Sequence, residues 1–510
     1  MRAGGAGELI ASAIVMVATV VPVARVLLRH PIRREFRSHP VLGTLAVIGT
    51  IAVLGVGLRL YGESPGVRRG IVVVAAVGAL VAWIHARPSY GIRRGLPPGS
   101  LGLATSLDAV DDPAFYARSA SRHGPVFKMR QVHRPVACVS DLTVGRDVLH
   151  RNDRSLGSSE WSFNRLVPGG YLEYMEGDVH ARYRHAFAPA FTTEAVRAAH
   201  GVIARTSRRQ LSTMAQSAGS TGVHPEPYLL EVPFVALLHT VLGVPPEHPR
   251  LPALRAGFEA ITVPFEVHLP TPPSIARGYA DLVAITHELA EVAADSPVPS
   301  VLRSLARQDA AHARDATIAG NLVLMVKEGS IMVRGLLRWV LKALAADPSH
   351  ARSMRAAAGD TGQLEALSVA FVRETLRLHE SRYLYRTARD DVAIGPFRVP
   401  KGWLIRVCIG EAHEDPRHFP DPQHFDPSRF MGSLPGPDRY CPFGAGPHAC
   451  LGEDLTLAIA GGFAREAALG FDLHTVSDGP VWRINRHWGL WRPSPEFRLS
   501  LTPQAAGTHA

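Results

Sequence analysis

Hydrophobic residues fall into three long apolar runs near the start of the chain and then into shorter amphipathic segments. The runs cover about residues 9–28, 41–58 and 70–86. A bilayer core takes about 20 apolar residues, with about 17 as a lower limit. The pattern therefore predicts three transmembrane helices within residues 1–95. A cleaved signal peptide does not explain it, because the apolar runs repeat and no small-residue cleavage site follows the first run.

From residue 96 to residue 510 the pattern is that of a globular domain, mainly α with a smaller β region. The proline-rich stretch Leu96-Pro97-Pro98-Gly99 separates it from the apolar runs, because proline cannot continue a helix. The periodicity and the turn residues predict a strand pair at 125–130 and 135–139, helices at 321–346 and 364–378, a hairpin around Gly395 and Gly402, and a closing strand pair within 482–501.

The formal net charge of +10 belongs almost entirely to the apolar segment. Residues 1–97 hold twelve arginines against three glutamates, which gives +9 and leaves +1 for the rest of the chain. A nucleic-acid-binding protein would concentrate its basic charge on the globular domain. We therefore expect no nucleic-acid partner, and membrane lipid around the first 95 residues.

Arginine placement predicts the orientation in the membrane, since cytoplasmic connectors are enriched in Lys and Arg. Four arginines between residues 29 and 37 place the first connector in the cytoplasm. With three spans, the globular domain is also cytoplasmic. If residues 70–86 only lie on the membrane surface, this orientation inverts.

The chain has four cysteines, which are too few for a disulfide framework. One of them, Cys450, lies in a glycine-rich loop. Cys450 ends the stretch Phe443-Gly444-Ala445-Gly446-Pro447-His448-Ala449-Cys450 and precedes an apolar helical run. A thiolate is the metal-binding form of cysteine, and a helix N-terminus favours the anion. The glycines let the backbone turn sharply and approach a flat ligand. Taken alone, such a loop is also typical of a plain turn with a buried thiol. The other three cysteines are expected to be structural: Cys138, Cys408 and Cys441.

With Leu451 and Gly452, the stretch resembles the haem-ligand loop of the cytochrome P-450 family, Phe-Gly-x-Gly-x-His-x-Cys-x-Gly, at all six specified positions. The resemblance covers roughly residues 96–503, with its motifs in the family's order. It implies a cytochrome P-450-like fold that holds haem b between two helices. It also implies that Cys450 is the axial ligand of the haem iron and that Phe443 and Gly444 contact the haem.

A second set of residues resembles the family's ligands for the haem propionates. His180 and Arg184 are four residues apart and share one helix face, as in the family's helix that grips a propionate. Arg386 and His448 resemble the residues that complete this site. Arg389 is an alternative to Arg386 as a propionate ligand.

A third set resembles the family's buried cluster of one glutamate and two arginines, which positions the cysteine loop. Glu374 and Arg377 are three residues apart on one helical segment, so their side chains share a face. Arg429, in a turn-rich segment, is the second arginine of this predicted cluster.

The run at 321–346 departs from the family. In the family, the corresponding helix crosses the distal face of the haem and carries the sequence Ala-Gly-x-(Asp/Glu)-Thr-Thr. The acid and the hydroxyl of this sequence relay protons. In one register Ile331 and Met332 replace the acid and the first threonine; in the other Glu328 is the acid and Gly329 replaces the threonine. None of the residues at the threonine position carries a hydroxyl. The oxygen-activating pair is incomplete in both registers.

Glu328 has two interpretations. As a structural residue it pairs with Lys327 or Arg334 on the helix surface. As a catalytic residue it lies over the haem, where Gly329 permits close approach. The fatty-acid ω-hydroxylase branch of the family carries Glu-Gly at this place. A carboxylate buried there would have a raised pKa and serve as a proton donor.

The resemblance implies hydroxylation of a small molecule by O₂ and two electrons. The proline-rich and apolar segment 224–300 suits a lipophilic substrate. We expect a separate electron-donor protein, a ferredoxin or a flavoprotein reductase. Because the oxygen-activating pair is incomplete, two alternatives stay open. One is a haem-thiolate peroxygenase or isomerase, and the other is a non-enzymatic membrane haem protein.

Overall fold

The computed structural model describes residues 95–102, 105, 108–109, 112, 114–131, 134–158, 166–262, 272–380, 383–481 and 492–504. The three predicted transmembrane helices lie outside these residues. The chain divides into two compact units, Met1–Phe115 with Phe127–Val136, and Tyr116–Val126 with Ala137–Ala510.

The described part of the first unit contains most of a strand pair. Strand β1 (Val126–Gln131) pairs with β2 (Arg134–Val139), as the alternating pattern predicted. On β1, Lys128 donates through its backbone N to Pro98 O (2.7 Å) and through Nζ to Pro97 O (2.6 Å). The proline-rich stretch is thereby attached to β1.

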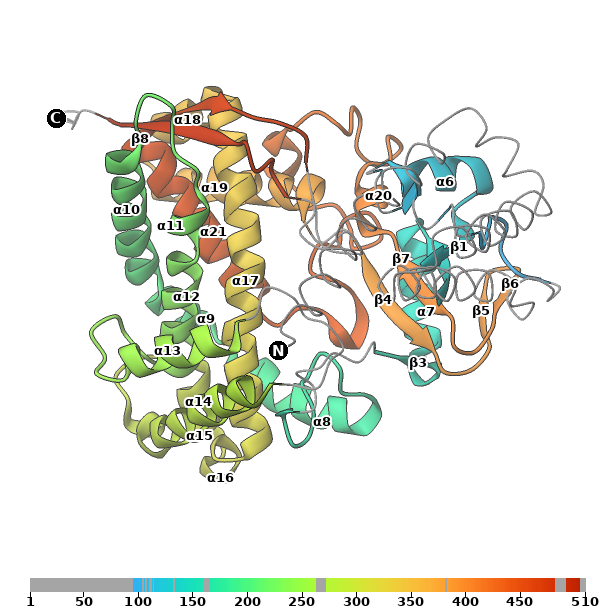
Figure 1. The fold of residues 1–510 in the computed structure, drawn as a ribbon, viewed down its shortest axis with the longest axis horizontal. Coiled ribbons are helices and arrows are strands. Elements are labelled where there is room, and N and C mark those ends of the chain that lie inside the picture. Colours follow the sequence, from blue (N-terminus) through green and yellow to red (C-terminus); the bar gives the residue numbers. More distant parts are fainter. Residues whose placement is uncertain are drawn as a thin grey trace, which may run out of the picture. The chain divides into compact units, whose positions relative to one another are not determined.

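Helices dominate the described residues, so the predicted mainly α class is confirmed (Figure 1). The α-helices are α6 (Phe115–His123), α7 (Leu142–Arg151), α8 (Gly177–Phe187), α9 (Thr193–Ala198), α10 (His200–Ser217), α11 (Glu226–Leu229), α12 (Glu231–Leu237), α13 (Leu251–Ile261), α14 (Pro273–Val292), α15 (Val301–Gln308), α16 (Ala310–Ala313), α17 (Ala316–Ala346), α18 (Pro348–Ala356), α19 (Thr361–His379), α20 (Ile409–His413) and α21 (Glu453–Gly470).

The smaller β region of the second unit is antiparallel. Strand β4 (Leu384–Ala388) pairs with β7 (Leu404–Val407) on one side and with β3 (Leu156–Gly157) on the other. Strands β5 (Val392–Ile394) and β6 (Phe397–Val399) form the hairpin predicted around Gly395, which has a positive φ of 56°. The closing pair differs from the prediction.

In that closing pair, β9 (Arg498–Pro503) pairs with β8 (Phe471–Ser477), which precedes the predicted range 482–501. The strand β8 follows α21 directly, so the apolar pattern of α21 masked the change from helix to strand at Phe471.

Helix α17 begins five residues before the predicted start at 321. The Asp315 side chain accepts hydrogen bonds from Thr317 N (2.7 Å) and Ile318 N (3.1 Å). These bonds satisfy backbone donors that a helix N-terminus leaves open. Of the described helices, only α17 is long and apolar enough to cross a membrane, but 67% of its apolar window is buried inside the protein. It is a core helix.

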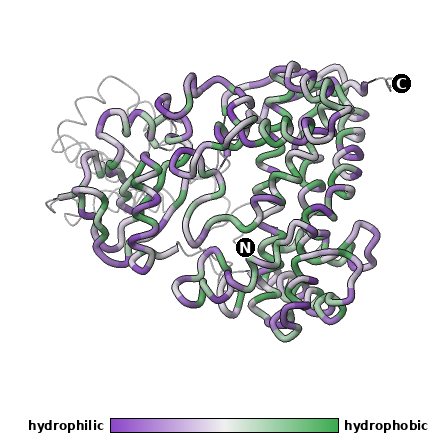
Figure 2. Tube along the Cα trace, turned by 180° about the vertical axis from the view of Figure 1, so that it is seen from behind, coloured by the Kyte–Doolittle hydropathy of each residue, from purple (hydrophilic) through white to green (hydrophobic). Residues whose placement is uncertain are grey.

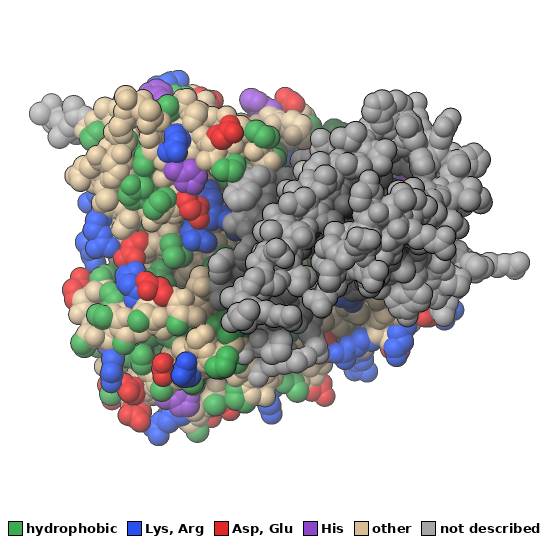
Figure 3. All heavy atoms as spheres, in the orientation of Figure 1, with side chains coloured by type: hydrophobic (Ala, Val, Ile, Leu, Met, Phe, Trp, Pro, Cys, Tyr) green, Lys and Arg blue, Asp and Glu red, His purple; other side chains and the backbone are tan. Residues whose placement is uncertain are grey.

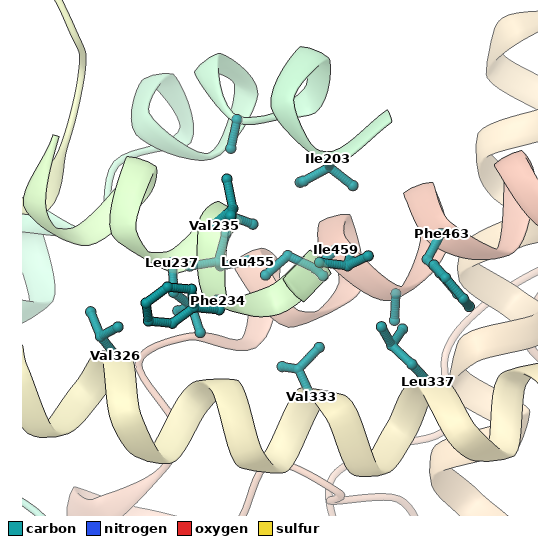
Figure 4. Close-up of a cluster of buried hydrophobic side chains, with 14 of the residues drawn as sticks. Ile203, Phe234, Val235, Leu237, Val326, Val333, Leu337, Leu455, Ile459 and Phe463 are labelled. Carbon is teal, nitrogen blue, oxygen red and sulfur yellow. The ribbon is translucent and has the colours of Figure 1, made fainter. Parts of the chain in front are cut away.

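The core of the second unit lies between α10, α12, α17 and α21 (Figure 4). Hydrophobic and hydrophilic positions alternate around the helices, which directs one side of each toward this core (Figure 2). The labelled side chains are Ile203 of α10, Phe234, Val235 and Leu237 of α12, Val326, Val333 and Leu337 of α17, and Leu455, Ile459 and Phe463 of α21.

On the face drawn in Figure 3, the acidic and basic side chains of the described residues are interspersed. Ion pairs between described residues include Lys342 with Asp478 (2.6 Å) and Arg208 with Glu466 (2.6 Å). This part of the surface therefore has no single-sign patch of the kind that binds a phosphate backbone.

Candidate active site

Cys450 lies at the end of a tight loop, three residues before the first residue of α21, Glu453. Its backbone N donates to Phe443 O (2.8 Å), and its Sγ accepts a hydrogen bond from Gly452 N (3.3 Å). Gly444 and Gly446 have φ of 78° and 73°, a region where other residues are strained. The loop thus holds the cysteine sulfur beside a backbone donor, and Cys450 is exposed.

The protein's own groups do not favour a free thiolate at Cys450, contrary to the expectation from the helix N-terminus. Although the residue is exposed, the surrounding protein removes enough water to raise the pKa of its thiol. The Gly452 amide lowers that pKa and the carboxylate of Glu453 raises it. Desolvation outweighs the helix N-terminus here, so the anionic form depends on a bound cation, which deprotonates a coordinating thiol.

Four cationic or imidazole side chains gather beside this loop. Arg184 of α8 donates through Nη1 to Ala449 O (2.6 Å). The rings of His180 and His448 stack with centroids 3.9 Å apart. Arg386 of β4 lines the same cavity as His448. The structure therefore brings together all four residues predicted to hold the haem propionates.

Positive charge surrounds the His448 imidazole. Burial first, and then the positive charges of Arg386, His180 and Arg184, lower the pKa of His448 to about 3. The competing Arg389 instead forms an ion pair with Glu176. An anion bound among these groups would relieve their mutual repulsion.

Glu374 and Arg377 form a fully buried ion pair on α19. Arg377 donates through Nε (2.7 Å) and Nη2 (2.8 Å) to the two carboxylate oxygens, and both side chains are 0% exposed. Glu374 Oε1 also accepts from Asp426 N (2.8 Å) and lies 3.6 Å from Arg429 Nε. Arg377 Nη1 donates to His413 O (2.8 Å). The cluster joins α19 to the segments that precede the cysteine loop.

On α17, Glu328 and Gly329 point in different directions. Glu328 Oε1 accepts a hydrogen bond from Lys327 Nζ (2.6 Å), and the Glu328 side chain is 33% exposed. A Cβ at Gly329 would lie 3.0 Å from Leu237 Cδ1. Gly329 thus permits close packing against α12, and its proximity to a ligand stays a prediction. Met332, one turn beyond Glu328, is 48% exposed.

Sequence reasoning missed Asn321. This fully buried residue accepts from Leu172 N through Oδ1 (2.7 Å) and donates through Nδ2 to Gly170 O (3.1 Å). Its Nδ2 also donates to Thr317 O (2.8 Å). The one signal in the sequence was a polar residue in a strongly apolar helical run. A buried amide must find partners, and here it binds a loop far away in the sequence.

Comparison with known proteins identifies the fold that carries this site. The sequence model of the Cytochrome P450 family matches residues 336–501, a range that includes the buried Glu374–Arg377 pair and the Cys450 loop. The chain belongs to the cytochrome P450 family. The predicted resemblance is confirmed by this match together with the relatives and the solved structure below.

Known proteins are similar to this chain over different shares of its length. Abscisic acid 8'-hydroxylase 3 of Oryza sativa subsp. indica is 26% identical, over 71% of this chain and 78% of its own length. Dimethylnonatriene synthase of Arabidopsis thaliana is 30% identical over 33% of this chain and 36% of its own length. The solved structure of retinoic acid bound cyanobacterial CYP120A1 has a TM-score of 0.65 at 20% identity, with 80% of this chain and all of that chain covered. That likeness shows the fold.

P450 proteins bind haem b through a cysteine thiolate, and haem b is the cofactor of this chain. The residues present fit it. The cofactor carries two carboxylates, and the site offers the cationic cluster described above, where burial and then the positive charges of Arg386, His180 and Arg184 lower the pKa of His448 to about 3. It also offers a cysteine sulfur for the iron. This P450 is accordingly a member of a family of haem-thiolate monooxygenases.

Proposed function

We propose that this P450 hydroxylates a lipophilic small molecule, using O₂ and two electrons from a separate electron-donor protein. The observation that carries the proposal is the position of Cys450. Its sulfur accepts a hydrogen bond from Gly452 N, just before α21 (3.3 Å). Arg184 Nη1 donates a hydrogen bond to the carbonyl oxygen of the adjacent Ala449 (2.6 Å). The loop thus carries the sulfur that would bind a metal, and Arg184 of α8, which would bind a carboxylate, is hydrogen-bonded to the same loop.

In this proposal Cys450 would hold the haem iron through its sulfur, and His180, Arg184, Arg386 and His448 would hold the haem carboxylates. When bound, a haem with a thiolate ligand supplies electron density that favours cleavage of an O–O bond. The Gly452 amide donates to the sulfur and tunes its donation to the metal.

Other residues hold this arrangement in place. The Phe443 carbonyl accepts a hydrogen bond from Cys450 N (2.8 Å), and Gly444, with a φ of 78°, makes the turn of this loop. The buried cluster of Glu374, Arg377 and Arg429 fixes the segments that lead into the loop.

For the substrate we propose an isoprenoid-like hydrocarbon skeleton, with or without a carboxylic acid. The names of the relatives specify abscisic acid and dimethylnonatriene, and the CYP120A1 structure holds retinoic acid. The helices α12 and α17 pack together through apolar side chains, including Phe234 and Leu237 of α12 and Val326 of α17. An apolar interior beside the predicted site supports a hydrocarbon ligand.

The composition of α17 favours one second candidate. Met332 occupies the place of the threonine in one register and is 48% exposed. Without the usual acid and hydroxyl on that helix, peroxide-driven oxygenation becomes a candidate activity. Product formation with hydrogen peroxide and no reductant would favour it, whereas product formation only with an electron donor would favour the monooxygenase.

We further propose that residues 1–95 anchor the protein in a membrane, with the P450 domain on the cytoplasmic side. The three apolar runs and the arginines between residues 29 and 37 support this. Protease treatment of sealed, right-side-out vesicles should leave the domain intact and should digest it after the vesicles are opened. Digestion before opening would contradict the orientation.

The reduced carbon monoxide difference spectrum tests the proposed function. Wild-type protein should show the band of a thiolate-ligated haem, and lipophilic ligands should shift the ferric spectrum. Cys450→Ser should lose the thiolate band, whereas Cys441→Ser, at a buried cysteine of the same segment, should keep it. A Cys450→Ser spectrum equal to that of wild type would refute the assignment of the ligand.

A further inference from the structure

His413 is a buried histidine at the end of helix α20, and both its main chain and its ring are hydrogen-bonded. The residue is 0% exposed. Its carbonyl oxygen accepts a hydrogen bond from Arg377 Nη1 (2.8 Å), and its Nε2 accepts one from Cys441 N (3.0 Å). His413 therefore connects the buried Glu374–Arg377 pair to the segment that leads into the Cys450 loop.

Aromatic neighbours hold the His413 ring in one orientation. The imidazole stacks on the Tyr440 ring, with centroids 5.0 Å apart and planes 29° from parallel. The Phe419 ring lies edge-on to it, with centroids 6.3 Å apart. The Tyr440 hydroxyl donates to Arg373 O of α19 (2.9 Å), so the stacking partner is itself fixed. These contacts limit rotation of the imidazole and direct Nε2 at the Cys441 amide.

The hydrogen bond to Cys441 N acts on Cys450 over a short and stiff path. Pro442, whose ring fixes φ, is the one residue between Cys441 and Phe443. The Cys441 carbonyl accepts a hydrogen bond from Gly444 N (3.1 Å), and the Phe443 carbonyl accepts one from Cys450 N (2.8 Å). A displacement of Cys441 therefore moves the carbonyl to which the amide of Cys450 is bonded.

A plain packing role for the His413 ring leads to a different expectation. A phenylalanine at this position would fill similar space and keep aromatic contacts with Tyr440 and Phe419. It would leave Cys441 N without its acceptor, although Cys441 is only 6% exposed. A buried backbone donor without a partner is costly. The acceptor nitrogen, which apolar packing does not need, is thus the feature that distinguishes the two roles.

We propose that His413 is a positioning residue for the cysteine ligand: its Nε2 holds the Cys441 amide and thereby keeps the Cys450 sulfur in place for a metal. This inference rests on the proposed haem-thiolate function. Residues that orient a metal ligand through hydrogen bonds control how firmly the site holds its metal. Without the acceptor the loop can shift, and the sulfur of Cys450 is released more readily. His413 acts through Cys441 and needs no contact with the cofactor.

The rate at which the thiolate band is lost from the reduced carbon monoxide spectrum tests this role. The full chain is used in detergent, with haem bound. His413→Phe keeps an aromatic ring and removes the acceptor, whereas His413→Gln removes the ring and offers a carbonyl oxygen. The band should decay roughly 10-fold faster in His413→Phe, since an unsatisfied buried amide costs about one factor of ten in an equilibrium constant. In His413→Gln it should decay at nearly the wild-type rate.

The control variant is His418→Phe, at an exposed histidine of the same segment, and it should decay like wild type. Fast decay in His413→Gln with slow decay in His413→Phe would mean that only the ring matters, and would overturn the proposal. If His413→Phe does not retain haem, His413→Met takes its place, because methionine fills irregular gaps and lacks a strong acceptor. Decay of His413→Met at the His413→Gln rate would likewise overturn the proposal.

Failure of the proposed function can be told apart from failure of this inference. Absence of the thiolate band from the wild-type protein would overturn the proposed function and this inference with it. A wild-type band that decays at one rate in His413→Phe and His413→Gln would overturn this inference alone, and the proposed function would stand.

Discussion

Removing the carboxylate of Glu374 should destabilise the second unit severely. In Glu374→Ala, Arg377 loses its bonds of 2.7 and 2.8 Å to the carboxylate and keeps only the carbonyls of His413 (2.8 Å) and His424 (3.3 Å). The guanidinium is 0% exposed, so water cannot replace the lost partner. Removing one member of a buried ion pair costs about 3–5 kcal/mol. That is a large fraction of the about 5–15 kcal/mol that stabilises a typical protein.

The loss should appear in urea unfolding of the full chain in detergent, followed by far-ultraviolet circular dichroism. A matched control is Asp147→Ala, which breaks a pair with Arg151 on the surface of α7, where the two side chains are 48% and 78% exposed. Such pairs contribute about 0–1 kcal/mol. We expect Glu374→Ala to lower the unfolding midpoint markedly and Asp147→Ala to leave it nearly unchanged. Equal midpoints for the two variants would refute the argument from burial.

Two further predictions concern the haem site and α17. Arg184→Gln removes a charged hydrogen-bond donor, of the kind worth about 1.5–3 kcal/mol. Arg184→Gln should speed haem transfer to an apoglobin roughly 10- to 100-fold. The control variant Arg182→Gln, on the exposed side of α8, should leave the transfer rate unchanged. Equal transfer rates for the two variants would argue against Arg184 as a propionate ligand. Gly320→Ala places a Cβ 2.1 Å from Tyr279 Oη and should cost about 1–3 kcal/mol by overpacking. Tyr279→Phe should cost little, since that hydroxyl is buried without a hydrogen-bond partner among the described residues. The double variant should recover most of the Gly320→Ala loss in urea unfolding, and no recovery would contradict the predicted clash.

Short-range spacing predicted the parts of the site that lie on one element. The pairing of Glu374 with Arg377 follows from a separation of three residues on a helix. The glycines of the Cys450 loop have the positive φ that their type permits. Cys138, Cys408 and Cys441 are buried as expected. By contrast, the meeting of His180 and Arg184 with Arg386 and His448 depends on tertiary structure, and only the family resemblance suggested it.

The sequence was a poor guide where a residue's role depends on what lies opposite it. A glycine next to Glu328 suits either a ligand or a helix, and the periodicity of α17 could not show that Gly329 faces Leu237. Burial outweighs the helix N-terminus at Cys450, and burial comes from the whole fold. Cys408 was expected to be a plain core residue, yet it accepts a hydrogen bond from Arg406 Nη1 (2.7 Å). Polar contacts of this kind leave no periodic pattern in a sequence.

The hydrogen bonds of Asn321 to Leu172 N and Gly170 O make the path of the loop that precedes α8 independent of the side chain at position 171, because they bind the main chain. Replacements at position 171 should therefore leave the bonds from Asn321 to Gly170 and Leu172 in place. The side chain at position 171 can change without loss of the attachment between this loop and α17.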